Sequence, residues 1–159
     1  MNENKKTVYI GGEGVFTAIS VGFFFVLVGA LLVITPNIFD ETLDFVRNIE
    51  LADVPHSDII FPAPASPSSH TVFYQAAAQF SFALGVFQFV MLTLRFFAQS
   101  PWRKQTETVG NLIFWLGAGF LIQTFLLDTT QWFVYWSLLL VVVGVSLIAR
   151  AMVLAAARL

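Results

Sequence analysis

The amino-acid sequence predicts an all-α integral membrane protein, in which four transmembrane helices form one antiparallel bundle. An outer amphipathic helix and an extended proline-rich segment are expected between the first two helices. Three observations support this fold class. Of the 159 residues, 57% are hydrophobic and only 11% are charged, whereas a soluble domain carries about 25% charged residues. Four apolar runs are each long enough to cross about 30 Å of hydrocarbon. Most basic residues lie on one side of these runs.

The four apolar runs organise residues 1–159 into a single transmembrane domain. None of the runs shows the polar stripe that a helix in a soluble bundle would carry. They cover residues 15–35, 72–94, 108–127 and 132–149. The first run is expected to remain as a helix, because it exceeds the roughly 7–15 apolar residues of a signal-peptide core and no A-x-A cleavage site follows it.

Residues 36–71 form the one sizeable segment expected outside the membrane. In residues 37–53, apolar side chains recur at helical spacing with charged ones between them, which predicts an amphipathic helix on the outer membrane surface or on the bundle. Residues 54–69 contain four prolines and are predicted to be extended and partly polyproline-like.

The same outer segment is acidic. It contains one basic side chain, Arg47, and six carboxylates, which are Asp40, Glu41, Asp44, Glu50, Asp53 and Asp58. Such a surface attracts cations and suits the mouth of a cation path. The alternative is a solvated acidic loop that merely follows the membrane topology.

Short connections between the later apolar runs indicate which helices are neighbours. Ser100 and Pro101 are suited to begin the third helix, and Arg103 and Glu107 then lie one turn apart and can form an ion pair. Residues 128–131 leave only a tight turn before the fourth helix. The third and fourth helices are therefore expected to be antiparallel neighbours.

Basic residues outside the apolar runs predict the orientation. Only Arg47 lies on the outer side, and the others share the side of both termini; these are Lys5, Lys6, Arg95, Arg103, Lys104, Arg150 and Arg158. Cytoplasmic loops carry an excess of Lys and Arg. We therefore expect a multi-pass protein of the cell membrane with both termini in the cytoplasm.

Missing residue types exclude several kinds of chemistry. The chain has no cysteine, which removes thiol nucleophiles, disulfide exchange and thiolate metal sites. Its formal net charge of −2 provides no basic face for nucleic acid. Ionisable side chains deep in a membrane normally mark proton relays and catalytic centres, and none lies deep in these runs. We therefore expect no enzymatic activity and no bound cofactor.

Three residues of the outer segment are candidate metal ligands. His56, Asp58 and His70 offer imidazole and carboxylate groups, which suit zinc or a similar ion. The H-x-D spacing of the first two is too common to specify a site, so exposed loop residues are the alternative.

Neutral amides are the other polar groups of the apolar runs. They are Gln75, Gln79, Gln88, Asn111 and Gln123. Gln75 and Gln79 share one helix face, and Gln88 lies about half a turn away from it, so the amides form no continuous stripe. Gln88 and Asn111 both fall in the inner half and are placed to pair. Such amides either bond between helices or line a path for water.

Small residues recur seven positions apart, which is nearly two helical turns. The glycines of these patterns are Gly22, Gly29, Gly85, Gly110, Gly117 and Gly144. Stripes of small residues allow helix backbones to approach closely in lipid. The pattern predicts close helix packing, either within the bundle or against other subunits.

These observations favour a non-catalytic polytopic membrane protein. It is expected to contact the lipid bilayer and to act by self-association or as an accessory subunit of a larger membrane complex. The alternative is an oligomeric channel for cations or small solutes, with the acidic segment as an outer vestibule and the amides along the path.

Overall fold

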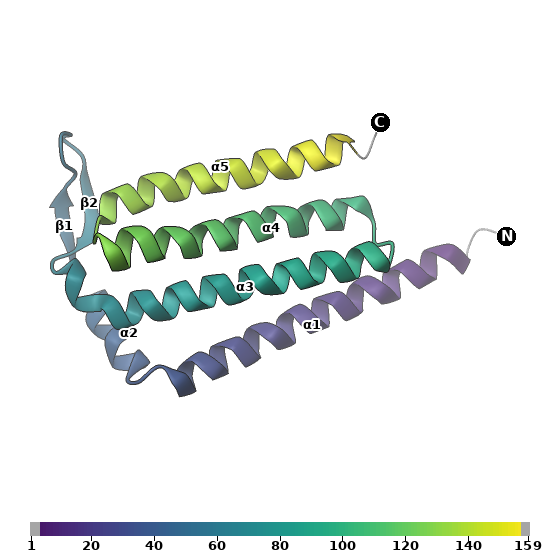
Figure 1. The fold of residues 1–159 in the computed structure, drawn as a ribbon, viewed down its shortest axis with the longest axis horizontal. Coiled ribbons are helices and arrows are strands. Elements are labelled where there is room, and N and C mark those ends of the chain that lie inside the picture. Colours follow the sequence, from purple (N-terminus) through teal and green to yellow (C-terminus); the bar gives the residue numbers. More distant parts are fainter. Residues whose placement is uncertain (1–3, 157–159) are drawn as a thin grey trace.

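The computed structural model describes the backbone of residues 4–156 and the side chains of residues 12–156, and it is mostly helical (Figure 1). The long helices are α1 (Asn4–Ile34), α3 (Thr71–Phe97), α4 (Trp102–Leu121) and α5 (Trp132–Ala156). A π-helical segment, η2 (Ile122–Asp128), extends α4. Within the described residues, four helices are long and apolar enough to cross a membrane, as the sequence predicts.

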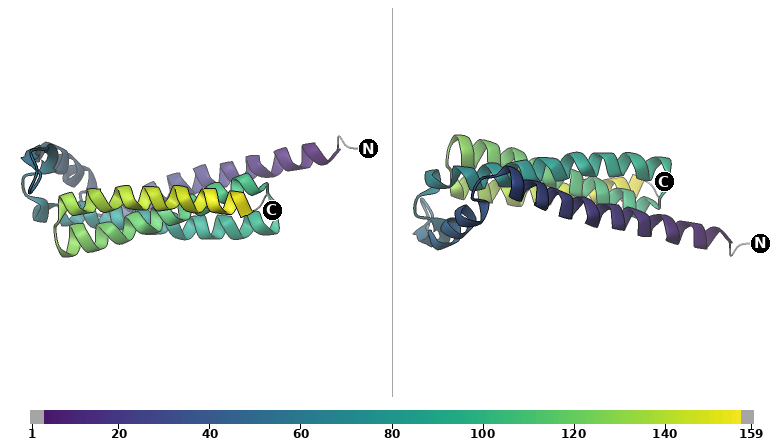
Figure 2. Two further views of the ribbon diagram at one scale, coloured as in Figure 1. Left: turned by 90° about the horizontal axis from the view of Figure 1, so that it is seen from above. Right: turned by 90° about the horizontal axis from the view of Figure 1, so that it is seen from below.

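The long helices lie side by side in the order α1, α3, α4, α5, and each runs antiparallel to the next (Figures 1 and 2). The main contacts follow this order, with α3 packed along α4 and α4 along α5. Helix α1 crosses α3 at an angle and makes a much smaller contact with it. The result is an open row, in which α1 stands at one edge and α5 at the other.

The row has two distinct ends. The terminal end holds the start of α1, the end of α5 and the turn at residues 98–101 (Figure 1). The hairpin end holds the segment between α1 and α3. The buried core lies toward the hairpin end, between α3, α4, η2 and α5; it consists of Tyr74, Ala78, Leu121, Ile122, Leu126 and Tyr135.

Glycines explain the close approach of α4 to its two neighbours. A methyl group added at Gly85 of α3 would clash with Leu116 of α4. One added at Gly117 of α4 would lie 2.7 Å from Cγ1 of Val142 on α5. Because neither position has room for a side chain, these two glycines bring the three helices together.

The segment at the hairpin end differs from the sequence-based expectation. The prediction of a helix over residues 37–53 is wrong in its second part, because α2 spans only Ile38–Arg47. Strand β1 (Ile49–Asp53) follows, and it pairs antiparallel with β2 (Ile60–Pro64). The polyproline-like conformation predicted for residues 54–69 is therefore replaced by a strand over β2, and a short 3₁₀-helix, η1 (Pro67–His70), leads into α3.

Asn48 is the physical reason for the early end of α2. Its carbonyl oxygen accepts a hydrogen bond from the N–H of Ala65 at 2.9 Å. Its side-chain oxygen accepts a second bond from the N–H of Ser66 at 3.0 Å. Both bonds turn Asn48 toward the far strand, so the chain leaves the helix and starts the sheet.

Two prolines are accommodated in β2 because the sheet has only two strands. The carbonyl oxygen of Pro62 accepts the indole N–H of Trp132 at 2.9 Å. The backbone of this residue therefore faces away from β1, where its missing N–H costs no ladder bond. Pro64, two positions on, has the same orientation along the strand. The Trp132 bond also ties the hairpin to the start of α5.

Candidate functional site

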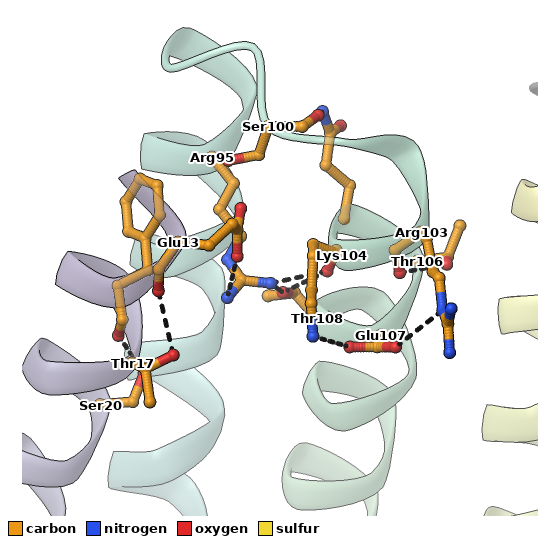
Figure 3. Close-up of polar contacts among 12 residues, drawn as sticks. Glu13, Thr17, Ser20, Arg95, Ser100, Arg103, Lys104, Thr106, Glu107 and Thr108 are labelled. Atoms are coloured by element: carbon orange, nitrogen blue, oxygen red, sulfur yellow. Dashed lines mark hydrogen bonds and ion pairs between the residues drawn. The ribbon is translucent and has the colours of Figure 1, made fainter. Parts of the chain in front are cut away.

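A cluster of charged side chains at the terminal end of the row contains the ion pairs found among residues 12–156 (Figure 3). Arg95, in the last turn of α3, is at its centre. Its Nη2 lies 3.4 Å from Oε2 of Glu13 on α1. Its Nη1 donates to the carbonyl oxygen of Lys104 at 2.8 Å and to Oγ1 of Thr108 at 3.0 Å, both on α4. One guanidinium group therefore joins three helices.

The Glu13–Arg95 pair is mostly withdrawn from the surface. The side chain of Arg95 is 12% exposed and that of Glu13 is 21% exposed. The ring of Phe16 also lies beneath the guanidinium, 5.5 Å from its carbon. Within residues 12–156, Oε1 of Glu13 and Nε of Arg95 are buried and find no hydrogen-bond partner. The pair is therefore incompletely satisfied, although it is the only ion pair between α1 and another helix in this part of the chain.

Glu107 extends the same cluster to the fourth helix. Its Oε2 lies 3.0 Å from Nζ of Lys104, and its Oε1 lies 3.6 Å from Nε of Arg103. The Arg103–Glu107 pair expected from the sequence is thus confirmed. Oε1 also lies 3.4 Å from Nη2 of Arg150 on α5. Lys104 links the two halves, because its carbonyl binds Arg95 and its ammonium group binds Glu107.

Sequence reasoning did not identify the Glu13–Arg95 contact. A signal for it is present, because one residue precedes the first apolar run and the other ends the second run on the same side. Antiparallel neighbours bring those two ends together. Opposite charges at such positions indicate an ion pair, but the neighbour relation of the helices must be known first.

The candidate metal ligands are not brought together. His70 is buried, and its Nε2 lies 3.1 Å from Oδ1 of Asn48. Because that oxygen already accepts the N–H of Ser66, Nε2 must carry the proton and donate to it. His56 and Asp58 are exposed in the turn between the strands. Among the residues that the structure describes, no three His, Asp or Glu side chains are grouped to hold a metal ion.

Two of the predicted amides line a cleft at the hairpin end. Gln75 and Gln79 of α3 face the end of α1, where Thr35 and Pro36 form the opposite wall. The cleft has a volume of about 200 Å³. No residue between 12 and 156 forms a hydrogen bond with either amide, so both groups are open to an occupant of the cleft.

The other three amides also lack partners within the described side chains. Gln88 is half-buried, and Asn111 and Gln123 are exposed. The pairing of Gln88 with Asn111 that the sequence allows is not formed. Hydrogen bonds between the long helices instead come from Arg95, which donates to Thr108 and the Lys104 carbonyl, and from Arg150, which donates to Glu107.

The predicted packing glycines divide into two groups. Gly85, Gly110 and Gly117 lie against neighbouring helices, with the Gly110 methyl position 3.4 Å from the carbonyl oxygen of Ser146. Gly22, Gly29 and Gly144 do not, because a methyl group at each would meet open space. These three therefore form no close contact within the described chain, and packing against other subunits stays a prediction for them. Their helices, α1 and α5, are the two edges of the open row, which is the reason for the difference.

Comparison of the chain with protein-family models, with curated proteins and with solved structures gives no match.

Proposed function

We propose that this chain is a non-catalytic, multi-pass protein of the cell membrane, which acts by associating laterally with copies of itself or with other membrane subunits. Four helices of sufficient length and apolarity support its insertion in a bilayer. The basic residues of the terminal end and the acidic residues of the hairpin end support a cytoplasmic location for both termini.

The open row of helices is the observation on which the proposal rests. No residue in the apolar span of α1 is buried within the chain. Gly22 and Gly29 lie on the side of α1 that faces away from α3, and Gly144 is similarly open on α5. Small residues on exposed helix faces permit close backbone contact between transmembrane helices. Lateral association would cover the exposed faces of α1 and α5, the two edge helices of the row.

The ionisable groups of the terminal end support a structural role over a catalytic one. Glu107 is surrounded by three basic side chains, and Glu13 is engaged with Arg95. General acid–base catalysis requires a titratable group within hydrogen-bond reach of a bound substrate. Here Glu13 instead joins α1 to α3, and Glu107 joins α4 to α5.

A channel is the second candidate, and the unpartnered amides favour it. Gln75, Gln79 and Asn111 are exposed side chains of apolar helices, and several copies placed around an axis would bring such groups to a shared path. Asp40 and Glu41, in the first turn of α2, would lie near the mouth of that path. An electrogenic cation leak in proteoliposomes that falls when Asp40, Glu41 and Asp44 are neutralised together would favour the channel.

The mass of the assembly in lipid nanodiscs tests lateral association. We expect a mass above that of one chain, and a lower mass for the Gly22→Leu/Gly29→Leu variant, because leucine keeps the partner backbone at a distance. Val21→Leu is the matched control, because it adds bulk on a different side of α1, about 100° away. A wild-type protein of single-chain mass, both in nanodiscs and when extracted from its native membrane, would overturn the proposal.

A further inference from the structure

We propose that the cleft between α1 and α3 binds the uncharged, hydroxyl-bearing head group of a membrane lipid. The inference rests on the proposed insertion in a bilayer, but it does not depend on lateral association. It is carried by the two amides, by their depth along the helix and by the absence of charge among the residues that line the cleft.

The side-chain amides of Gln75 and Gln79 lie next to each other in the cleft, and neither has a hydrogen-bond partner among residues 12–156. Gln75 and Gln79 are one turn apart and lie on one side of α3. By contrast, the hydroxyls of Ser81 and Thr93 on this helix donate to the carbonyls of Ala77 and Phe89. Each glutamine offers two N–H donors and one acceptor oxygen. Leaving such groups unpaired in hydrocarbon is costly, so an occupant that pairs with them is favoured.

The two amides lie near the end of α3, close to the boundary between the lipid head groups and the hydrocarbon. Helix α3 begins at Thr71, and at 1.5 Å per residue Gln75 lies about 6 Å and Gln79 about 12 Å along it. The 27-residue helix is about 40 Å long, which exceeds the hydrocarbon thickness by about 10 Å. A bilayer centred on the helix therefore places Gln75 at the hydrocarbon boundary and Gln79 about 7 Å inside the hydrocarbon.

The chemistry of the lining selects an uncharged, hydroxylated group. The other lining side chains include Thr35, Pro36, Ile34 and Val72, and none of the lining residues is charged. Because the lining contains no basic side chain, it offers no charged partner for a phosphate or carboxylate. Hydroxyl groups both donate to and accept from amides, so they fit the two glutamines.

The size of the cleft favours a head group over a second polypeptide. A volume of about 200 Å³ suits a small polyol, whereas a helix with its side chains is about 10 Å across. Further along the two helices, toward the terminal end, the rings of Phe23 and Phe87 stack with centroids 4.0 Å apart and close the space between α1 and α3. Phe24 and Phe80 also meet there edge to face, with centroids 6.0 Å apart. An attached acyl chain must therefore leave the cleft sideways, into the bilayer.

Binding of radiolabelled mono-oleoylglycerol to the purified full-length protein tests this inference. We expect saturable retention by the wild type and at least a ten-fold weaker affinity for Gln75→Leu/Gln79→Leu. Leucine has a similar volume but cannot form hydrogen bonds. Gln88→Leu is the matched control, because it removes an amide from the same helix outside the cleft. Methyl oleate, which lacks hydroxyl groups, and dioleoylphosphatidylglycerol, whose head-group glycerol is attached through a charged phosphate, should be retained poorly.

Three results would overturn the inference: no saturable binding to the wild type, equal binding by all variants, or binding of methyl oleate as tight as that of mono-oleoylglycerol. The thermal stability of each variant shows that loss of binding is not loss of fold. The mass of the assembly, measured in the same samples, separates the two proposals. An intact assembly without lipid retention contradicts only the lipid site. A single chain that retains the lipid contradicts only lateral association.

Discussion

At the scale of single residues, Arg95 determines how α1 is attached. Its guanidinium group contacts Glu13 on α1 and two acceptors on α4. Arginine is suited to this position because its fork of donors serves several acceptors at once, whereas lysine offers a single compact charge. Arg95 therefore attaches one end of α1 by charge, whereas Phe23 and Phe24 pack against α3 further along the helix.

Substitution of Arg95 tests this role. Arg95→Leu should lower the free energy of unfolding by about 1–3 kcal/mol, because it leaves the Glu13 carboxylate without its charged partner. Adding Glu13→Gln to that variant should recover part of the loss, since the double variant leaves no unpaired charge. Thermal unfolding of the two single variants and the double variant in detergent measures the coupling. Strictly additive losses would mean that the two side chains do not interact.

Asn48 plays a comparable role at the opposite end. It accepts the N–H of Ser66 and the Nε2–H of His70 with one side-chain oxygen. Asn48→Ala should therefore loosen the hairpin without unfolding the long helices. Hydrogen exchange of the amides of Val54 and Ala65, which are hydrogen-bonded near the ends of the two strands, is expected to become faster. Unchanged exchange at both amides would show that the side chain of Asn48 does not hold the hairpin.

At the scale of elements, the glycines separate contacts within the chain from open faces. Gly117→Leu should lower the thermal stability in detergent by about 1–3 kcal/mol, because the new side chain would overlap Val142. Gly144→Leu, on the adjacent helix, should leave the stability of a single chain unchanged, since its added atoms meet open space. Equal losses for both variants would contradict the arrangement of α4 and α5.

The long helices could be predicted from the sequence, and the hairpin could not. An apolar run of sufficient length favours a helix by its own composition, so the expected spans, except for Thr35, fall within α1, α3, α4 with η2, and α5. The strands depend on pairing between distant positions, such as Leu51 with Pro62. The apolar residues among residues 49–53 continue the helical spacing of α2, so the sequence pattern favours a helix there. The helix ends instead at Arg47, because Asn48 is hydrogen-bonded to residues 65 and 66.

The candidate site shows the same division. The amides and glycines were recognisable by residue type, but their surroundings depend on which helices are neighbours. Gly117 and Gly144 belong to similar patterns, yet only one meets a neighbouring helix because α4 is central and α5 is at an edge. The Glu13–Arg95 pair joins residues far apart in the sequence, and its formation required the order of helices in the row.

At the scale of the whole molecule, the two ends of the row differ in charge. The cluster at the terminal end has more basic than acidic side chains, and α2 at the hairpin end carries Asp40, Glu41 and Asp44 against Arg47. Because cytoplasmic segments carry an excess of Lys and Arg, the proposed orientation has the hairpin outside the cell.

Single cysteines test this orientation, since the chain has none of its own. Arg103 is a suitable position because its side chain is 80% exposed, whereas Gln105 is buried and donates to the carbonyl of Ser100. Ser68 is exposed at the hairpin end. In intact cells, an impermeant thiol reagent should label Ser68→Cys but not Arg103→Cys. The reverse labelling would show that the orientation is inverted.

Photo-crosslinking from the open face of α1 in the native membrane tests lateral association most directly. A photoreactive amino acid at Val26, which is 70% exposed, should form a covalent product with a second copy or with another membrane protein. At Phe23, which stacks on Phe87, the same group should react mainly within the chain. Products at Val26 that contain only lipid and one chain would contradict the proposed association.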